Sequence, residues 1–270
     1  MEIKCFRHSV CTQNFAFLEK DKFTFSVLLR ILQGECALTL VKGERLVICH
    51  SAVPYPVWIW LPDDASEEEM EEAYALTKQH LGIAGYRFNL KYPLAKYFIE
   101  RARQEGVSLK VTTNMLAYAC EEAVAPKKAA EGMLQKAEKR DLFCVTDFVR
   151  GFFMDAGLLA DVASESAYEE KAKRHISQGF YFWSKGGERV ACAALNEMAD
   201  QCSIGAVFTK REHRRQGYAS HLVYALAKQI LDSGKLPTLY TNADYSASNA
   251  CYMKIGFTPR GGLCTIGEST

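Results

Sequence analysis

The chain has 270 residues, of which 49% are hydrophobic and 24% charged, proportions typical of a globular protein with one large or two ordinary domains. The formal net charge of +1 gives no overall attraction to nucleic acid or to an acidic membrane surface. The N-terminal residues lack a signal-peptide pattern, and no apolar run approaches the ~18 residues of a membrane span. We therefore expect a cytoplasmic protein with no membrane or nucleic-acid partner.

The first half of the chain alternates strand and helix patterns. Lys42-Gly43-Glu44 is a hairpin turn between two apolar runs, and Ser66 with Glu69 makes a capping box that predicts the start of a helix. Strand patterns occupy residues 36–41, 45–49, 57–61 and 108–112, and helix patterns occupy residues 66–80 and 92–105.

The second half contains more elements of both kinds, after an irregular stretch over residues 113–140. We place a domain boundary near residue 130, which gives domains of residues 1–130 and 131–270. Helices are predicted over residues 141–155, 165–176, 217–232 and 248–255, and strands over 180–183, 189–195, 204–209, 239–241 and 263–266. This order predicts an α/β fold, with a mixed sheet and helices on both faces.

One order of elements occurs twice, as strand, charged turn, helix, strand, helix, strand. The two copies cover residues 57–112 and 204–266 and share almost no residues. The pattern therefore suggests a repeated fold in two diverged halves.

The ten cysteines show no Cys-x-x-Cys pair and no Cys/His spacing typical of metal ligands. Most lie in apolar runs, such as Ile48-Cys49 and Val190-Ala191-Cys192. A cysteine in such a run behaves as a small buried hydrophobic residue. We favour that role over a redox or metal-binding one, and we expect no metal.

A basic loop joins the strand over 204–209 to the helix that follows it. Its residues Arg214-Arg215-Gln216-Gly217 lead into the first helical turn. Backbone N–H groups at a helix start lack partners, and the helix dipole adds positive charge there, so the loop suits an anion such as a pyrophosphate. Gly217 would let the backbone approach a phosphate or adopt positive φ. A solvated basic turn is the alternative interpretation.

Two motifs resemble those of the GNAT superfamily of acyl-CoA N-acyltransferases. Arg214-x-x-Gly217-x-Ala219 matches the first signature of that family, and the segment 240–257, with Asn249 and Tyr252 ahead of Gly256-Phe257, is similar to the second. The resemblance covers roughly residues 131–270. The whole chain resembles bacterial two-domain members in which the N-terminal half is a degenerate copy of the complete C-terminal domain.

The resemblance implies that acetyl-CoA is the co-substrate and that no metal takes part. In that family a strand edge pairs with the pantetheine arm, loop amides hold the pyrophosphate, an asparagine contacts the pantetheine, and a tyrosine protonates the departing thiolate. The implied acid is Tyr252. The implied cofactor-binding residues are Val207, Phe208, Thr209, Arg214, Arg215, Gln216, Gly217, Tyr218, Ala219, Ser220 and Asn249.

The sequence does not determine which group acts as the general base. Glu197, at the end of the strand over 189–195, is the leading candidate, and Asp200, Glu212 and His213 are the others. Each of these is also an ordinary surface residue of a turn, and members of the superfamily often use a chain of waters instead.

The expected activity is transfer of an acetyl group to a primary amine of a small molecule or peptide, with a homodimer left open as the assembly. The alternative is a non-catalytic acyl-CoA-binding or sensor module. A nucleic-acid binder that uses the basic cluster over 210–215 is a weaker third reading, because the cluster is short and has no interleaved aromatic residues.

The matching loop of the first half is acidic. Pro62-Asp63-Asp64-Ala65 is followed by three glutamates, and no glycine opens the backbone. These carboxylates suit a helix N-terminus and would repel a pyrophosphate. We therefore expect cofactor binding only in the C-terminal half.

Overall fold

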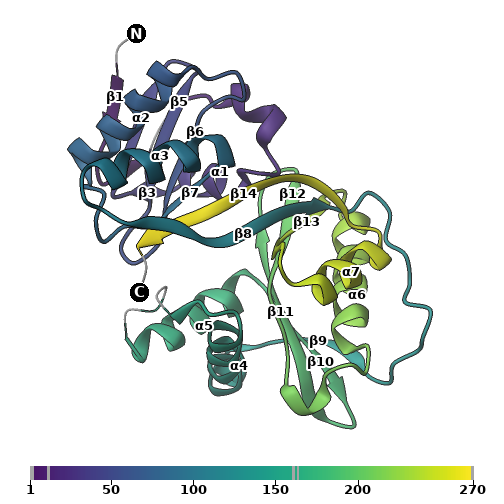
Figure 1. Ribbon diagram of the computed structural model, residues 1–270. Coiled ribbons are helices and arrows are strands. Elements are labelled where there is room, and N and C mark those ends of the chain that lie inside the picture. The colour runs from purple at the N-terminus through teal and green to yellow at the C-terminus, as the bar shows by residue number, and fades with distance from the viewer. Residues whose placement is uncertain (1–2, 11–12, 160–161, 163, 269–270) are drawn as a thin grey trace. The chain divides into compact units, whose positions relative to one another are not determined.

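The computed structural model describes residues 3–10, 13–159, 162 and 164–268 (Figure 1). The chain packs into two compact units: unit 1 holds Met1–Leu116, Asn242–Asp244 and Arg260–Thr270, and unit 2 holds Ala117–Thr241 and Tyr245–Pro259. Neither unit is one continuous stretch, whereas the sequence analysis divided the chain once, near residue 130. That single division stays a prediction. No helix among the described residues has the length and apolar character needed to cross a membrane.

Unit 1 is a mixed sheet with helices packed against it. Its elements are β1 (Ile3–Phe6), β2 (Ser9–Val10), η1 (Ala16–Asp21), α1 (Ser26–Leu32), β3 (Glu35–Cys36), β4 (Leu38–Lys42), β5 (Leu46–His50), β6 (Val57–Trp60), α2 (Glu67–His80), β7 (Phe88–Leu90), α3 (Tyr92–Gln104), most of β8 (Leu109–Ala119) and most of β14 (Thr258–Glu268). The pairs β1–β4, β4–β5 and β5–β6 are antiparallel, β6–β7 is parallel, and β7–β14 is antiparallel.

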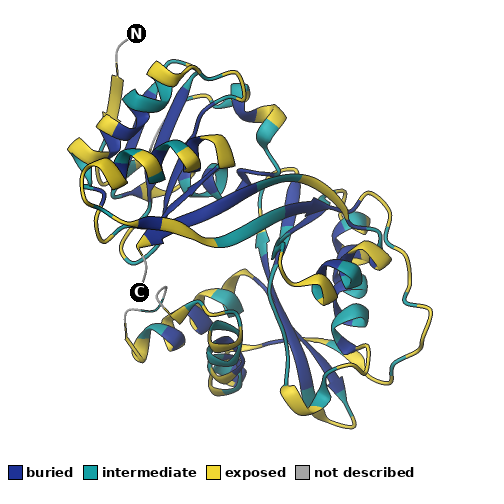
Figure 2. Cartoon of the chain, in the orientation of Figure 1, coloured by how far each residue is buried: buried dark blue, intermediate teal, exposed yellow. Residues whose placement is uncertain are grey.

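The core of unit 1 forms between the sheet and helices α2 and α3. Tyr74 of α2 packs edge-on against Phe98 of α3 with ring centroids 5.1 Å apart, and Phe98 also contacts Phe88 of β7. All three side chains are almost completely buried, and Figure 2 shows the strands β5 and β6 of this unit in the dark blue of buried residues. The continuous burial of β4, β5 and β6 explains why these strands are nearly all apolar.

The predicted capping box of α2 is present. The Glu69 N–H donates to Ser66 Oγ at 3.3 Å, and the Ser66 N–H donates to Glu69 Oε2 at 2.9 Å. Arg45 donates to Glu69 at 2.7 Å and to Asp64 at 2.8 Å, and its guanidinium lowers the pKa of Glu69 to about 2. The N-terminus of α2 therefore has a side-chain cap, and Arg45 balances the charge of Glu69 beside it.

The strands of unit 2 are also mixed in direction. Its elements are β9 (Met133–Lys136), η2 (Lys139–Asp141), α4 (Leu142–Asp155), α5 (Ser166–Gln178), β10 (Phe180–Lys185), β11 (Glu188–Glu197), β12 (Gln201–Thr209), η4 (Arg211–His213), α6 (Tyr218–Asp232), β13 (Leu236–Asn242) and α7 (Ser246–Ile255). The pairs β9–β10, β10–β11 and β11–β12 are antiparallel, and β12–β13 is parallel.

Helices cover both faces of the unit 2 sheet. Phe180 and Phe182 of β10 form one core with Phe148 of α4 and Tyr168 of α5. Tyr181 lies between those two phenylalanines in the strand and so points to the other face, where its hydroxyl accepts a hydrogen bond from Gln229 of α6 at 3.2 Å. The mixed sheet with helices on both faces, expected from the sequence, is therefore confirmed.

The two units repeat one order of elements. In each, three antiparallel pairs precede a parallel pair, and β6-α2-β7-α3 corresponds to β12-α6-β13-α7. The strand after α7 pairs within unit 1, where Cys264 lies opposite Leu90, while the end of β8 lies in unit 2, where the Cys120 N–H donates to Pro237 O. Each unit thus takes part of its last strand from the other half of the sequence.

The capping box predicts how substitutions of Ser66 change the free energy of unfolding. Replacing Ser66 by alanine should lower the free energy of unfolding by about 1 kcal/mol, because the Glu69 N–H loses its acceptor. Replacing Ser66 by aspartate keeps an acceptor and should leave the free energy near that of the wild type. Urea unfolding followed by circular dichroism measures both, and equal values for S66A and wild type would contradict the role of the cap.

Candidate functional site

Strand β12 is paired along its full length on one side only. It pairs with β11 as far as Thr209, opposite Ala191, whereas its parallel register with β13 ends at Ser203, opposite Thr238. Beyond Ser203, the edge that faced β13 has no further strand partner in that register within the described part of the chain. Val207, Phe208 and Thr209 are each half-buried there. The structure therefore leaves an open strand edge at three of the predicted cofactor residues.

A β-bulge lies at the start of this open edge. Cys192 of β11 lies opposite Phe208, but Ala194 lies opposite Gly205, so β12 carries one extra residue. Ala206 has a positive φ of 48° at the bulge, and the Cys192 thiol donates to its carbonyl oxygen at 3.5 Å. A bulge bends the strand that carries it, and this one lies just beyond the end of the β12–β13 register.

Glycine in α4 permits close packing behind the bulge. A Cβ on Gly151 would lie 2.8 Å from Phe208 Cζ, which is too close for a larger residue without movement of the ring. Phe148, one turn earlier, contacts the same ring at 6.0 Å between centroids. The sequence analysis did not identify Gly151, although a glycine inside a predicted helix is a usable signal of close approach.

The N-terminus of α6 has no cap. Gly217 occupies the N-cap position with φ 88°, no side chain accepts from the first turn, and that turn contains no acidic residue. In the described part of the chain, the backbone N–H groups from Arg215 to Ser220 have no acceptor; the His221 N–H is the next that has one, Gly217 O at 3.1 Å. Arg215 also has positive φ, at 61°. Unpaired N–H groups and the helix dipole make this terminus an anion site.

The basic side chains of the loop differ in availability. Arg214 is held by Asp155 at 2.8 Å and donates to Thr209 O at 3.1 Å, and Lys210 pairs with Glu188 at 3.0 Å. Arg215 is exposed and has no side-chain partner among the described residues. Of the two arginines in the motif, Arg215 is therefore the one available to an anion, and Arg214 fixes the loop to α4.

The remaining loop residues connect the first turn of α6 to its surroundings. Gln216 Oε1 accepts from the buried Tyr218 hydroxyl at 3.0 Å, and Ala219 is small and half-buried. Ser220 Oγ lies 3.1 Å from Cys251 Sγ of α7. The last contact brings the two motifs of the sequence together, because α7 carries the second one.

Helix α7 places the predicted acid in an apolar setting. Tyr252 is 9% exposed and Asn249 is 8% exposed. The Tyr252 ring packs edge-on against Phe257 at 6.2 Å between centroids, and its hydroxyl has no hydrogen-bond partner within the described residues. Burial raises the pKa of Tyr252 well above that of an ordinary phenol, so the hydroxyl keeps its proton at neutral pH.

The predicted base lies elsewhere on the sheet. Glu197 is opposite Cys202, about five residues and roughly 17 Å along β12 from Val207. Its side chain is 62% exposed, and its carboxylate pairs with Lys235 at 2.8 Å. The structure does not bring Glu197 to the open edge or to the loop, and its role as base stays a prediction.

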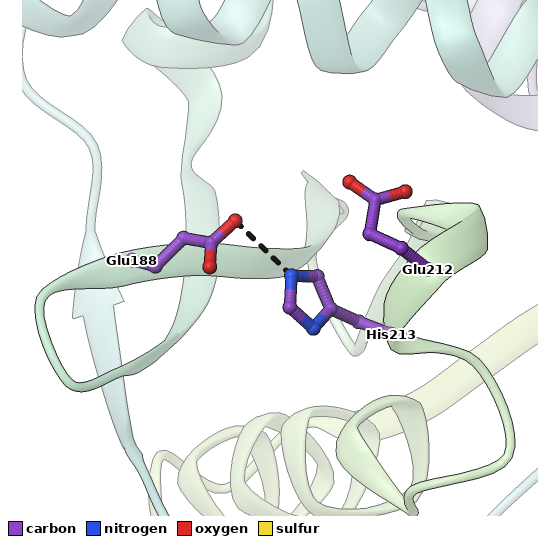
Figure 3. Close-up of side chains that lie close together, drawn as sticks. All are labelled: Glu188, Glu212 and His213. Atoms are coloured by element: carbon purple, nitrogen blue, oxygen red, sulfur yellow. Dashed lines mark hydrogen bonds and ion pairs between the residues drawn. The ribbon is translucent and has the colours of Figure 1, made fainter.

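Three side chains near the loop have the chemistry of metal ligands. Glu188, Glu212 and His213 offer ligand atoms that all lie within 4.8 Å of one another, and Glu188 accepts from His213 Nε2 at 3.1 Å (Figure 3). Lys210 and His213 lower the pKa of Glu188, and Lys210 already supplies the positive charge that a cation would bring. A metal ion would have to compete with Lys210 for the Glu188 carboxylate, which links β11 to the loop through Lys210 and His213.

A comparison with models of protein families finds a match in the second half of the chain. A family model described as FR47-like protein matches residues 183–264, a segment that contains β12, the basic loop, α6 and α7. No curated protein matches the chain significantly.

Many solved structures share the fold. An acetyltransferase from the GNAT family of Colwellia psychrerythraea is 14% identical over 100% of both chains, with a TM-score of 0.58. A GCN5-related N-acetyltransferase from Sphaerobacter thermophilus is 11% identical, covers 98% of this chain and 95% of that one, and has a TM-score of 0.63. A GCN5-related N-acetyltransferase from Kribbella flavida is 16% identical over 96% and 97%, with a TM-score of 0.58. The chain therefore has the fold of the GNAT acetyltransferases, with an FR47-like segment over residues 183–264, which confirms the resemblance seen in its two motifs.

Proposed function

We propose that unit 2 is an acyl-CoA-dependent N-acetyltransferase, which moves an acetyl group from acetyl-CoA to a primary amine of a small molecule or peptide. The observation that carries the proposal is the uncapped N-terminus of α6, where the N–H groups from Arg215 to Ser220 have no acceptor among the described residues. Tyr218, Ala219 and Ser220 are buried or half-buried, and backbone donors of such residues are rarely left without a partner in a native protein. A ligand with two adjacent phosphates would supply the acceptors.

The open edge of β12 suits the amide-rich part of the same ligand. Val207, Phe208 and Thr209 continue past the point where β13 leaves, so an extended chain with amide groups could add there as a strand. The edge ends at the basic loop, so one linear ligand can reach both. CoA combines these two features, because its pantetheine arm carries amides and its pyrophosphate carries the charge.

Tyr252 is the proposed general acid. Bound acetyl-CoA would supply an activated acyl group whose release leaves a thiolate that needs a proton. An ordinary phenol already holds its proton at neutral pH, and burial raises the pKa of Tyr252 further. An ordinary phenol has a pKa of about 10 and an ordinary thiol about 8.5, so the transfer is uphill in water and requires a desolvated, more basic thiolate.

Deprotonation of the acceptor amine is not assigned to Glu197 in this proposal. Its ion pair with Lys235 would have to open, and it lies toward the far end of β12 from Val207. Proton transfer through water to a distant carboxylate fits this arrangement better than direct contact.

The first prediction concerns the backbone of the loop. Replacing Gly217 by aspartate puts a carboxylate at the anion site and should weaken acetyl-CoA binding at least about tenfold, which corresponds to about 1.4 kcal/mol. Gly234 offers a matched control, because it has a similar φ of 79° just past the other end of α6. Isothermal titration should give wild-type affinity for G234D, and unchanged affinity for G217D would refute the placement of the pyrophosphate.

A second prediction separates the two exposed arginines of the loop. Arg215→Ala should weaken acetyl-CoA binding about tenfold and reduce its salt dependence, because a charge-assisted hydrogen bond to phosphate is lost. Arg211→Ala removes an equal charge from a side chain that is 79% exposed and lies 3.7 Å from Asp155, and it should change affinity little. Equal losses for both variants would indicate a general charge effect and not a specific contact.

A third prediction tests the acid. Tyr252→Phe should lower kcat for amine acetylation about a hundredfold while leaving acetyl-CoA affinity within about twofold of wild type. Tyr245→Phe, at the start of the same helix and 51% exposed, is the control and should retain activity. Thiol release over a panel of primary amines measures both.

The same assay separates the enzyme from the alternative function. Acetyl-CoA binding without thiol release from any amine would favour a non-catalytic acyl-CoA-binding module. Release that does not depend on Tyr252 would keep the transferase and remove that residue from its acid role.

A further inference from the structure

Two cysteines of unit 1 lie in contact. Cys36 at the end of β3 and Cys49 in β5 have Sγ atoms 3.5 Å apart, and their side chains are 1% and 0% exposed. Neither is in a disulfide. A disulfide bond is about 2.05 Å long, so closing it would need a movement of roughly 1.5 Å, which side-chain rotation and small backbone shifts can supply. The described cysteines include no other pair for which a hydrogen bond joins the two sulfur atoms.

The neighbouring groups hold both sulfur atoms in place. Thr39 lies opposite Cys49 in the β4–β5 ladder, and its hydroxyl donates to Cys49 Sγ at 3.6 Å. The Cys36 thiol donates to Ile31 O at 3.3 Å. The Cys49 thiol, followed by Thr39, lowers the pKa of Cys36 to about 6 against the opposing effect of burial. Cys36 is therefore the more readily ionised of the two and the better nucleophile.

Cys36 lies in a short two-stranded ladder. Strand β3 has two residues and pairs with β2, which also has two, in the register Ser9 to Cys36 and Val10 to Glu35. Val10 is 46% exposed. Such a short ladder opens locally at a much lower free energy than the longer β4–β5 ladder behind it. Opening of β2 would expose Cys36 while Cys49 stays in the sheet.

We propose that Cys36 and Cys49 form a reversible intramolecular disulfide in the presence of a low-molecular-weight disulfide. The Cys36 thiolate attacks one sulfur of the oxidant, which forms a mixed disulfide and releases one small thiolate. The Cys49 thiolate then attacks Cys36 Sγ, forms the protein disulfide and releases the second small thiolate. The two protons from the cysteines convert these products to thiols, and the two electrons that the cysteines lose reduce the oxidant.

The bond would join β3 to β5 across the β4–β5 hairpin. Because it closes a loop of the chain, it restricts the unfolded state and should raise the thermal midpoint of unit 1. The proposal makes no use of acetyl-CoA and stands whether or not unit 2 is a transferase.

The test uses the full-length protein and oxidised glutathione under native conditions. After alkylation of remaining thiols and digestion without reductant, mass spectrometry should find the peptides of Cys36 and Cys49 linked, and dithiothreitol should reverse the link. A thermal scan of the oxidised protein should show a higher midpoint. Absence of the linked peptides, or random pairing among all the cysteines, would overturn the proposal.

Variants test the order of the two steps. Cys49→Ser should stop at a mixed disulfide of Cys36 with glutathione, whereas Cys36→Ser should leave Cys49 unmodified. Cys202→Ser, at a buried cysteine with no sulfur atom as its hydrogen-bond partner, is the control and should still form the link. Glutathione found on Cys49 in C36S would contradict Cys36 as the first nucleophile. If a serine variant fails to fold, the linked peptides in the wild type still decide the proposal.

Discussion

The uncapped N-terminus of α6 is the constraint on which the proposed site depends. The equivalent helix of unit 1, α2, begins with the capping box of Ser66 and Glu69, and Arg45 pairs with the Glu69 carboxylate. At α6 a left-handed glycine replaces the cap and no acidic residue follows it. The same order of elements thus contains one helix N-terminus with a cap and acidic residues and one without either, and only a few residues make the difference. Of these two ends, the α6 end is the one whose first turn lacks a side-chain cap and acidic residues.

Several contacts hold that end open. Arg214 ties the loop to α4 through Asp155, and Glu188 restrains it through Lys210 and His213. The β12–β13 register ends at Ser203, and the bulge at Ala206 follows it on the stretch of β12 that leads to the loop. These contacts link the loop to α4 and β11 through side chains. A site formed in advance loses less entropy on binding.

Local signals in the sequence predicted much of this. The capping box of α2, the β4–β5 hairpin and the glycine before α6 each follow from short-range chemistry, and the structure contains all three. The contacts that decide which arginine is available were not predictable, because Asp155 is distant in sequence from Arg214 and the pairing depends on the fold. The pairing of β14 with β7 depends on the fold in the same way. The short strands β1 and β2 carried too few residues for a pattern.

The central claim is that the α6 end, and not the α2 end, binds acyl-CoA. Backbone amide chemical shifts measured by NMR during titration with acetyl-CoA test it most directly, because they report on both helix ends in one sample. The account predicts large shifts for the amides from Arg215 to Ser220 and along Val207 to Thr209, with none for Ser66 to Met70. Shifts confined to α2, or no shifts at saturating acetyl-CoA, would contradict it.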